Sequence, residues 1–149
     1  MKIFMVCLGN ICRSPLAHGV MQRLVSESGL EWQVSSAGTG SWHVGDPPDS
    51  RAIAVADRYG TDIKHQRAAH FTAAMFDEAD VIFAMDKSNL RNILSLARTD
   101  ADRSKVRLFL DDSEVPDPYY DNSLFTSVYE MIEERCRHLL NDMVDGQGL

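Results

Sequence analysis

No apolar run in the sequence approaches the roughly 20 residues that a helix needs to cross a bilayer, so we expect no insertion into a membrane. The chain starts at Met1 with a strand pattern and shows no apolar segment followed by a cleavage site. A secretory signal peptide is therefore not expected. Together these absences predict a cytoplasmic protein.

Cysteine and positive charge are also scarce. Of the three cysteines, Cys7 and Cys12 share one short segment and Cys136 lies far away, so they do not form the disulfide framework of a small secreted protein. Lysine and arginine number 15 against 22 aspartates and glutamates, which gives a net charge of −7. Nucleic-acid-binding proteins normally carry a basic stripe, so we expect no nucleic-acid partner.

Two common nucleotide-binding motifs are missing. The sequence contains neither Gly-x4-Gly-Lys-Ser/Thr nor Gly-x-Gly-x-x-Gly, so neither an NTPase nor a dinucleotide-binding enzyme is indicated. The histidines show no metal-ligand spacing, and we expect no metal and no organic cofactor. These histidines are His18, His43, His65, His70 and His138.

The most informative segment present is Cys7-Leu8-Gly9-Asn10-Ile11-Cys12-Arg13-Ser14, which follows the apolar run 3–6. This order predicts a strand, a tight loop and a helix. Such a loop directs backbone N–H groups and the partial positive charge of a helix N-terminus toward an anion. Arg13 adds a planar fork that matches phosphate oxygens, and the same positive field favours the thiolate form of Cys7. The segment predicts a phosphate site facing a sulfur nucleophile.

Several residues of this segment admit more than one interpretation. Gly9 and Asn10 tolerate the left-handed backbone that a sharp anion-binding turn requires. Ser14 is placed either to cap the following helix or to donate its hydroxyl to the Cys7 sulfur. Cys12 is either a redox partner of Cys7 or a small loop residue, and Cys7 itself has the alternative of a buried core position.

Hydrophobic periodicity predicts alternating strands and helices. Strands separated by helices form right-handed crossovers, which gives an α/β fold with a parallel sheet covered on both faces. With 149 residues we expect one domain over residues 1–149, with an ordered core over about 1–143 and a short polar C-terminal tail. The predicted strands are residues 2–6, 32–36, 79–84 and 106–110, and the predicted helices are 15–27, 50–58, 86–97 and 124–143.

Asp117 is the candidate proton donor for the oxygen that leaves when a phosphate ester is cleaved. Pro116 and Pro118 restrict the backbone on both sides of it, in a loop that follows the fourth predicted strand. Ligands of parallel sheets bind beyond the carboxyl ends of the strands, where Cys7 also lies. The alternative is a turn aspartate, since Asp-Pro pairs are common in turns.

Aromatic residues accompany these segments. Tyr119 and Tyr120 follow the candidate acid, and Trp42 lies in a loop over residues 38–49 that is rich in glycine, proline and aspartate. A phosphotyrosine ring requires flat apolar walls beside an anion site, which aromatic side chains provide. The alternative for Trp42 is a partly exposed loop residue.

In combination, these segments resemble the low-molecular-weight protein tyrosine phosphatase family over nearly the whole chain. Residues 6–15 resemble the signature loop of that family in every defining position, and residues 117–120 resemble its general-acid segment. Further similar blocks are residues 36–39, 45–49 and 85–90. The resemblance implies a three-layer αβα fold, with a four-stranded parallel sheet in the order 2-1-3-4 between the helices.

The resemblance also implies a two-step, metal-free hydrolysis of phosphotyrosine and small aryl phosphates. Cys7 attacks phosphorus to form a cysteinyl-phosphate, and Asp117 acts first as general acid and then as base for water. Asn10 supports the loop, with Ser36 as its expected partner, and Ser14 supports the sulfur. The implied phosphate-binding residues are Leu8, Gly9, Asn10, Ile11, Cys12, Arg13 and Ser14. The resemblance also implies that Cys7 and Cys12 can form a disulfide. The implied walls of the substrate pocket are Ile11, Trp42, Tyr119 and Tyr120.

Three alternative functions stay open. Arsenate reductases of this fold need a further pair of relay cysteines, whereas only Cys136 lies outside the loop here. Protein-arginine phosphatases carry threonine where Ile11 stands. A phosphotyrosine-binding module without turnover would need neither Cys7 nor Asp117. The implied partners are phosphotyrosine-containing proteins or peptides, with inorganic phosphate and other oxyanions as inhibitors, and we expect a monomer.

Overall fold

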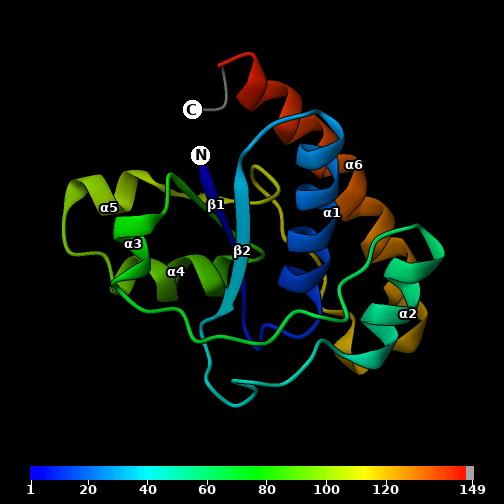
Figure 1. Cartoon of the computed structure of the whole chain (residues 1–149). Coiled ribbons are helices and arrows are strands. Elements are labelled where there is room, and N and C mark those ends of the chain that lie inside the picture. The colour runs from blue at the N-terminus through cyan, green and yellow to red at the C-terminus, as the bar shows by residue number, and fades with distance from the viewer. Residues whose placement is uncertain (147–149) are drawn as a thin grey trace.

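The computed structural model describes residues 1–146 and contains a parallel β-sheet between two layers of helices (Figure 1). The sheet has four strands in the order β2-β1-β3-β4, and every neighbouring pair is parallel. This confirms the predicted αβα architecture and strand order. The strands are β1 (Lys2–Cys7), β2 (Gln33–Gly38), β3 (Val81–Ala84) and β4 (Val106–Leu108).

The helices divide between the two faces of the sheet (Figure 1). One face is covered by α1 (Arg13–Glu27), α2 (Ser50–Arg58) and α6 (Phe125–Val144), and the other by α3 (Met75–Glu78), α4 (Lys87–Ser95) and α5 (Asp100–Ser104). Among residues 1–146, no helix is long and apolar enough to span a bilayer.

Strand β1 is apolar along most of its length because both of its faces are covered. Ile3 and Met5 belong to the core beneath α1 and α6, whereas Phe4 and Val6 belong to the core beneath α3 and α4. A continuous apolar run of this kind is typical of a strand buried in a parallel sheet. It brings Cys7, at the end of the strand, to the edge where the loops gather.

The strand order places three site segments side by side. Cys7 ends β1, Asp86 follows β3, and Asp117 lies in the segment after β4. Since β1, β3 and β4 are neighbours in the sheet, their carboxyl ends share one edge. The chain order of the strands reverses around β1, which is where parallel sheets bind ligands.

The first helix starts earlier than predicted. It begins at Arg13, and Cys12 occupies the N-cap position without a side-chain hydrogen bond. The prediction of Ser14 as the N-cap was therefore wrong, since Ser14 lies inside the first turn. Pro15 is tolerated in that turn because the first amides of a helix have no intrahelical acceptor to lose.

Four short helical segments were not predicted, because each is too short to show a hydrophobic period. They are α3, α5 and the 3₁₀ helices η1 (Pro118–Tyr120) and η2 (Asn122–Leu124). The 3₁₀ helices η1 and η2 give regular structure to the loop that follows Asp117. At the C-terminus α6 runs to Val144, and residues 147–149 of the predicted tail lie outside the described residues.

Candidate active site

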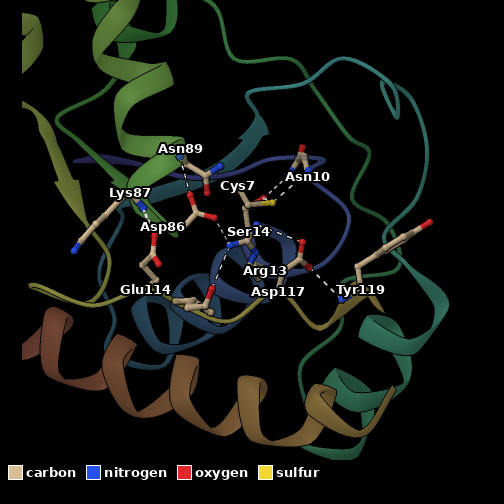
Figure 2. A network of polar contacts seen from close by, with 11 residues as sticks. Cys7, Asn10, Arg13, Ser14, Asp86, Lys87, Asn89, Glu114, Asp117 and Tyr119 are labelled. Atoms are coloured by element: carbon tan, nitrogen blue, oxygen red, sulfur yellow. Dashed lines mark hydrogen bonds and ion pairs between the residues drawn. The ribbon is translucent and has the colours of Figure 1, made fainter. Parts of the chain in front are cut away.

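The sulfur of Cys7 lies at the centre of a hydrogen-bonded loop (Figure 2). Its side chain is buried, and its Sγ atom lies 2.9 Å from Ser14 Oγ and accepts a hydrogen bond from the Asn10 amide at 3.3 Å. Ser14 can reach the sulfur because it occupies the first turn of α1. Of its two interpretations, contact with the sulfur is the one consistent with this geometry.

Asn10 fixes the shape of the loop. Its φ angle of 57° is left-handed, which asparagine adopts more readily than most residues. Its Nδ2 donates to Ser14 Oγ at 2.8 Å, and its Oδ1 accepts from the Ala69 amide at 2.9 Å. The loop is therefore tied both to α1 and to the segment that follows α2.

Ser36 does not make the expected hydrogen bond to Asn10. It pairs with Met5 in the sheet, two residues before the strand ends, and is therefore too far back along β2 to reach the loop. Its Oγ instead lies 3.0 Å from His18 Nδ1. Burial lowers the pKa of His18 to about 4, so this ring is neutral near pH 7.

Two glycines allow close packing around the loop. Gly9 does not have the expected left-handed φ, but a Cβ there would lie 3.2 Å from Cδ2 of His43. A Cβ at Gly38 would lie 2.8 Å from the Leu8 carbonyl oxygen. At position 9 a side chain would press against His43, whereas the backbone conformation itself does not call for glycine.

Arg13 is a buried cation that donates two hydrogen bonds and forms an ion pair with Asp117 (Figure 2). Only 4% of its surface is exposed, and its Nη1 donates to Asp86 Oδ2 at 2.7 Å and to the Val115 carbonyl at 3.2 Å. Its Nη2 lies 3.6 Å from Asp117 Oδ2. Burial alone would lower the pKa of Arg13, but Cys7 and the two carboxylates raise it above its ordinary value. The guanidinium is therefore both charged and oriented.

Asp86 lies at the start of the predicted helix 86–97 and makes two contacts. Its Oδ1 accepts from the Asn89 amide at 2.7 Å, which caps α4, while its Oδ2 pairs with Arg13. One carboxylate thus fixes the start of a helix and the orientation of the buried cation. The available signal was its position directly beyond β3, at the same edge of the sheet as Cys7.

Asp117 faces the loop and remains accessible to water. It precedes η1, its Oδ1 accepts from the Tyr119 amide at 3.1 Å, and 35% of its side chain is exposed. Figure 2 shows the carboxylate turned toward Arg13 while the Tyr119 ring points away from it. The carboxylate can therefore exchange protons with a ligand or with water beside the guanidinium.

Cys7, Arg13 and Asp117 line one pocket of about 280 Å³, whereas Asn10, Ser14 and Asp86 support it from behind the lining residues. Trp42 and Tyr120 lie at its mouth and are 71% and 89% exposed, so Trp42 is both a lining residue and an exposed loop residue. His43 also lines the pocket, a role that was not predicted, and its Nδ1 lies 3.1 Å from Asp46 Oδ2. The lining residues are Cys7, Leu8, Gly9, Ile11, Cys12, Arg13, Trp42, His43, Asp117, Tyr119 and Tyr120.

The remaining cysteines are buried thiols. Burial raises the pKa of Cys12 well above its ordinary value, and Asp49 and Cys7 add to the effect. Burial likewise raises the pKa of Cys136, which lies on α6. Within residues 1–146 no group of three or more histidine, cysteine and acidic side chains could hold a metal ion.

The sequence was compared with models of known protein families. The model described as low molecular weight phosphotyrosine protein phosphatase matches residues 2–147. The chain belongs to this family. It is accordingly a hydrolase of the protein-tyrosine-phosphatase class, and the resemblance seen in the signature loop is confirmed.

Individual relatives agree along most of their length. A low molecular weight phosphotyrosine protein phosphatase of Schizosaccharomyces pombe is 43% identical over 131 residues, covering 82% of this chain and 83% of that protein. A protein-tyrosine-phosphatase of Streptomyces coelicolor is 38% identical and covers 99% of this chain and 98% of that protein. The crystal structure of a protein tyrosine phosphatase from Entamoeba histolytica superposes with a TM-score of 0.92 at 33% identity, covering 99% of each chain.

Proposed function

We propose that this phosphatase hydrolyses phosphotyrosine monoesters through a cysteinyl-phosphate intermediate. The supporting observation is that a sulfur, a buried guanidinium and a partly exposed carboxylate line the same pocket, from Cys7, Arg13 and Asp117. The sulfur accepts hydrogen bonds, the guanidinium offers free N–H groups to oxygens, and the carboxylate can move a proton. Metal-free hydrolysis of a phosphate ester through a covalent intermediate uses these three functions together.

In the first step the phosphate lies against the loop amides and Arg13, which balance the charge on its oxygens. The Cys7 thiolate attacks phosphorus, so that the S–P bond forms as the P–O bond to the leaving group breaks. Asp117 gives its proton to the departing oxygen. The contacts of the sulfur with Ser14 Oγ and the Asn10 amide stabilise negative charge on it.

In the second step Asp117, now a carboxylate, takes a proton from water. The water oxygen attacks phosphorus, the S–P bond breaks, and the sulfur leaves as a thiolate. The contacts of the sulfur with Ser14 Oγ and the Asn10 amide also stabilise it as the leaving group. Arg13 and the amides supply the positive charge in both steps, so the proposed reaction needs no metal ion.

The form of the pocket supports an aromatic ester as substrate. Aromatic side chains at its mouth offer flat walls to a phenyl ring that carries a phosphate. Wzb from Vibrio vulnificus, which superposes with a TM-score of 0.83 at 31% identity, has been crystallised in complex with benzylphosphonate. Such a ligand joins an aromatic ring to a tetrahedral anion, as phosphotyrosine does.

A comparison of three phosphoryl donors tests the proposal. Hydrolysis of a phosphotyrosine peptide and of an aryl phosphate should proceed unchanged with excess chelator. Phosphoarginine should react at least about 10-fold more slowly, because Ile11 in the pocket offers it no hydrogen-bonding group. Preference for phosphoarginine, or loss of ester hydrolysis with chelator, would contradict the proposal. Thiol-dependent reduction of arsenate would favour the reductase alternative.

We also propose that Cys12 protects Cys7 from irreversible oxidation. Peroxide oxidises the Cys7 thiolate to a sulfenic acid. The Cys12 thiol then attacks that sulfur, a disulfide forms, and the hydroxyl group leaves with the thiol proton as water. After brief peroxide treatment, peptide mapping should find a Cys7–Cys12 disulfide, and dithiothreitol should restore activity.

The two other cysteines supply matched variants for this redox test. Cys12→Ser should lose activity irreversibly under the same treatment, since no second thiol reaches the sulfenic acid. Cys136→Ser should behave as wild type, because that thiol is buried on α6. If the wild type accumulates only sulfinic or sulfonic acid at Cys7, Cys12 has no protective role.

A further inference from the structure

Arg51 lies in the first turn of α2, outside the pocket. It pairs with Asp49 on one side and with the segment that follows Asp117 on the other. On the side of the proposed phosphate-binding loop (residues 7–14), Arg51 forms a bidentate ion pair with Asp49. Its Nε donates to Oδ1 at 2.9 Å and its Nη2 donates to Oδ2 at 2.8 Å. The Asp49 amide in turn donates to the Ile11 carbonyl oxygen at 2.8 Å. One edge of the Arg51 guanidinium is thus connected, through Asp49, to the loop that surrounds Cys7.

The rest of the Arg51 guanidinium faces the segment that carries Asp117. Its Nη1 donates to Asn122 Oδ1 at the start of η2. Its central carbon lies 5.4 Å from the centre of the Tyr119 ring and 4.7 Å from the centre of the Phe125 ring. A guanidinium is attracted to the face of an aromatic ring at such distances.

The path from Arg51 continues to the proposed general acid. Tyr119, whose ring stacks with Arg51, uses its backbone amide to hold Asp117 Oδ1. Asp117 also faces Arg13, which emerges from the phosphate-binding loop. Two arginines therefore act on Asp117. Arg13 pairs with its carboxylate directly, and Arg51 holds the turn that carries it.

We propose that Arg51 is a positioning residue that joins the phosphate-binding loop to the segment of Asp117 and so sets the distance between the acid and the leaving oxygen. This inference rests on the proposed hydrolysis mechanism. Proton transfer needs donor and acceptor within hydrogen-bond reach, and a displacement of about 1 Å can cost on the order of 100-fold in rate. Only a planar fork can pair with Asp49, Asn122 and an aromatic face at once, so lysine should not replace it.

The test compares two esters that differ in their need for a proton. Phenyl phosphate releases a weakly acidic phenol and depends on the general acid, whereas 4-nitrophenyl phosphate releases a much more acidic phenol. Arg51→Met should lower kcat/KM for phenyl phosphate at least about 10-fold, and for 4-nitrophenyl phosphate by less than about threefold. The inhibition constant of inorganic phosphate should stay within about twofold of wild type, since Arg13 and the loop are unchanged.

Matched variants separate positioning from a general loss of structure. Arg58→Met, on the same helix, removes a hydrogen bond to Thr126 of α6 and should leave the ratio of the two esters unchanged. Arg51→Lys should resemble Arg51→Met, because one ammonium group cannot span both loops. If Arg51→Met unfolds in a thermal melt, Asn122→Ala removes only one contact and should shift the ester ratio in the same direction.

A double-mutant cycle decides whether Arg51 acts through the acid. In an Asp117→Asn background, Arg51→Met should change phenyl phosphate turnover by less than about twofold, because the acid is already absent. An equal loss for both esters, or a full effect of Arg51→Met without the acid, would overturn the inference. Failure of the wild type to hydrolyse either ester would instead overturn the proposed function.

Discussion

Replacing Cys7 with serine should lower kcat for aryl phosphates and phosphotyrosine peptides by more than about 10⁴-fold. A serine hydroxyl is far less ionised and less nucleophilic than a thiolate, and no neighbouring base in the loop activates it. Serine is close in size to cysteine and can keep the contacts with Ser14 and Asn10. Steady-state assays should be paired with calorimetric titration of inorganic phosphate, which should still bind.

Cys136→Ser is the control for this substitution, because it removes a buried thiol from α6 that does not line the pocket. Its turnover should match the wild type. If Cys7→Ser instead kept more than about 1% of wild-type turnover with normal phosphate binding, the sulfur could not be the nucleophile.

Asp117→Asn should lower kcat/KM for phenyl phosphate by about 10²–10⁴-fold, the usual contribution of a general acid. Asparagine can still accept the hydrogen bond from the Tyr119 amide, so the turn should keep its shape. The loss should be smaller for 4-nitrophenyl phosphate, whose leaving group needs less protonation.

Asp121→Asn gives a matched control in the same segment. Asp121 caps η2 by accepting from the Ser123 amide, and asparagine can also accept that bond. Its kcat/KM should stay within about twofold of wild type for both esters, since a cap contact is retained. An equal loss in Asp121→Asn and Asp117→Asn would mean that the segment, and not one carboxylate, determines the rate.

Features that depend on neighbouring residues were predictable from the sequence. The apolar β1, the loop beyond it and α1 follow one another within 27 residues, so their local pattern predicts this strand–loop–helix unit. Asp117 was a candidate because prolines flank it. The helix boundary at Arg13 was missed because the loop, and not a cap, determines where α1 begins.

Contacts between distant segments were not predictable in the same way. Asp86 pairs with Arg13 across 73 positions of sequence, and only the order of β1 and β3 in the sheet brings them together. The expected Asn10–Ser36 bond failed because strand register places Ser36 beside Met5, two residues short of the loop. Such details depend on register and packing, which single-residue patterns do not contain.

Trapping the intermediate tests the central claim most directly. Mixing the enzyme with an excess of aryl phosphate, quenching in acid within milliseconds and mapping the peptides should show one phosphoryl group on the Cys7 sulfur. The amount of phosphorylated Cys7 should match the initial burst of phenol. A burst without phosphorylated protein, or a phosphoryl group on Ser14 or a histidine instead, would contradict the proposed role of Cys7.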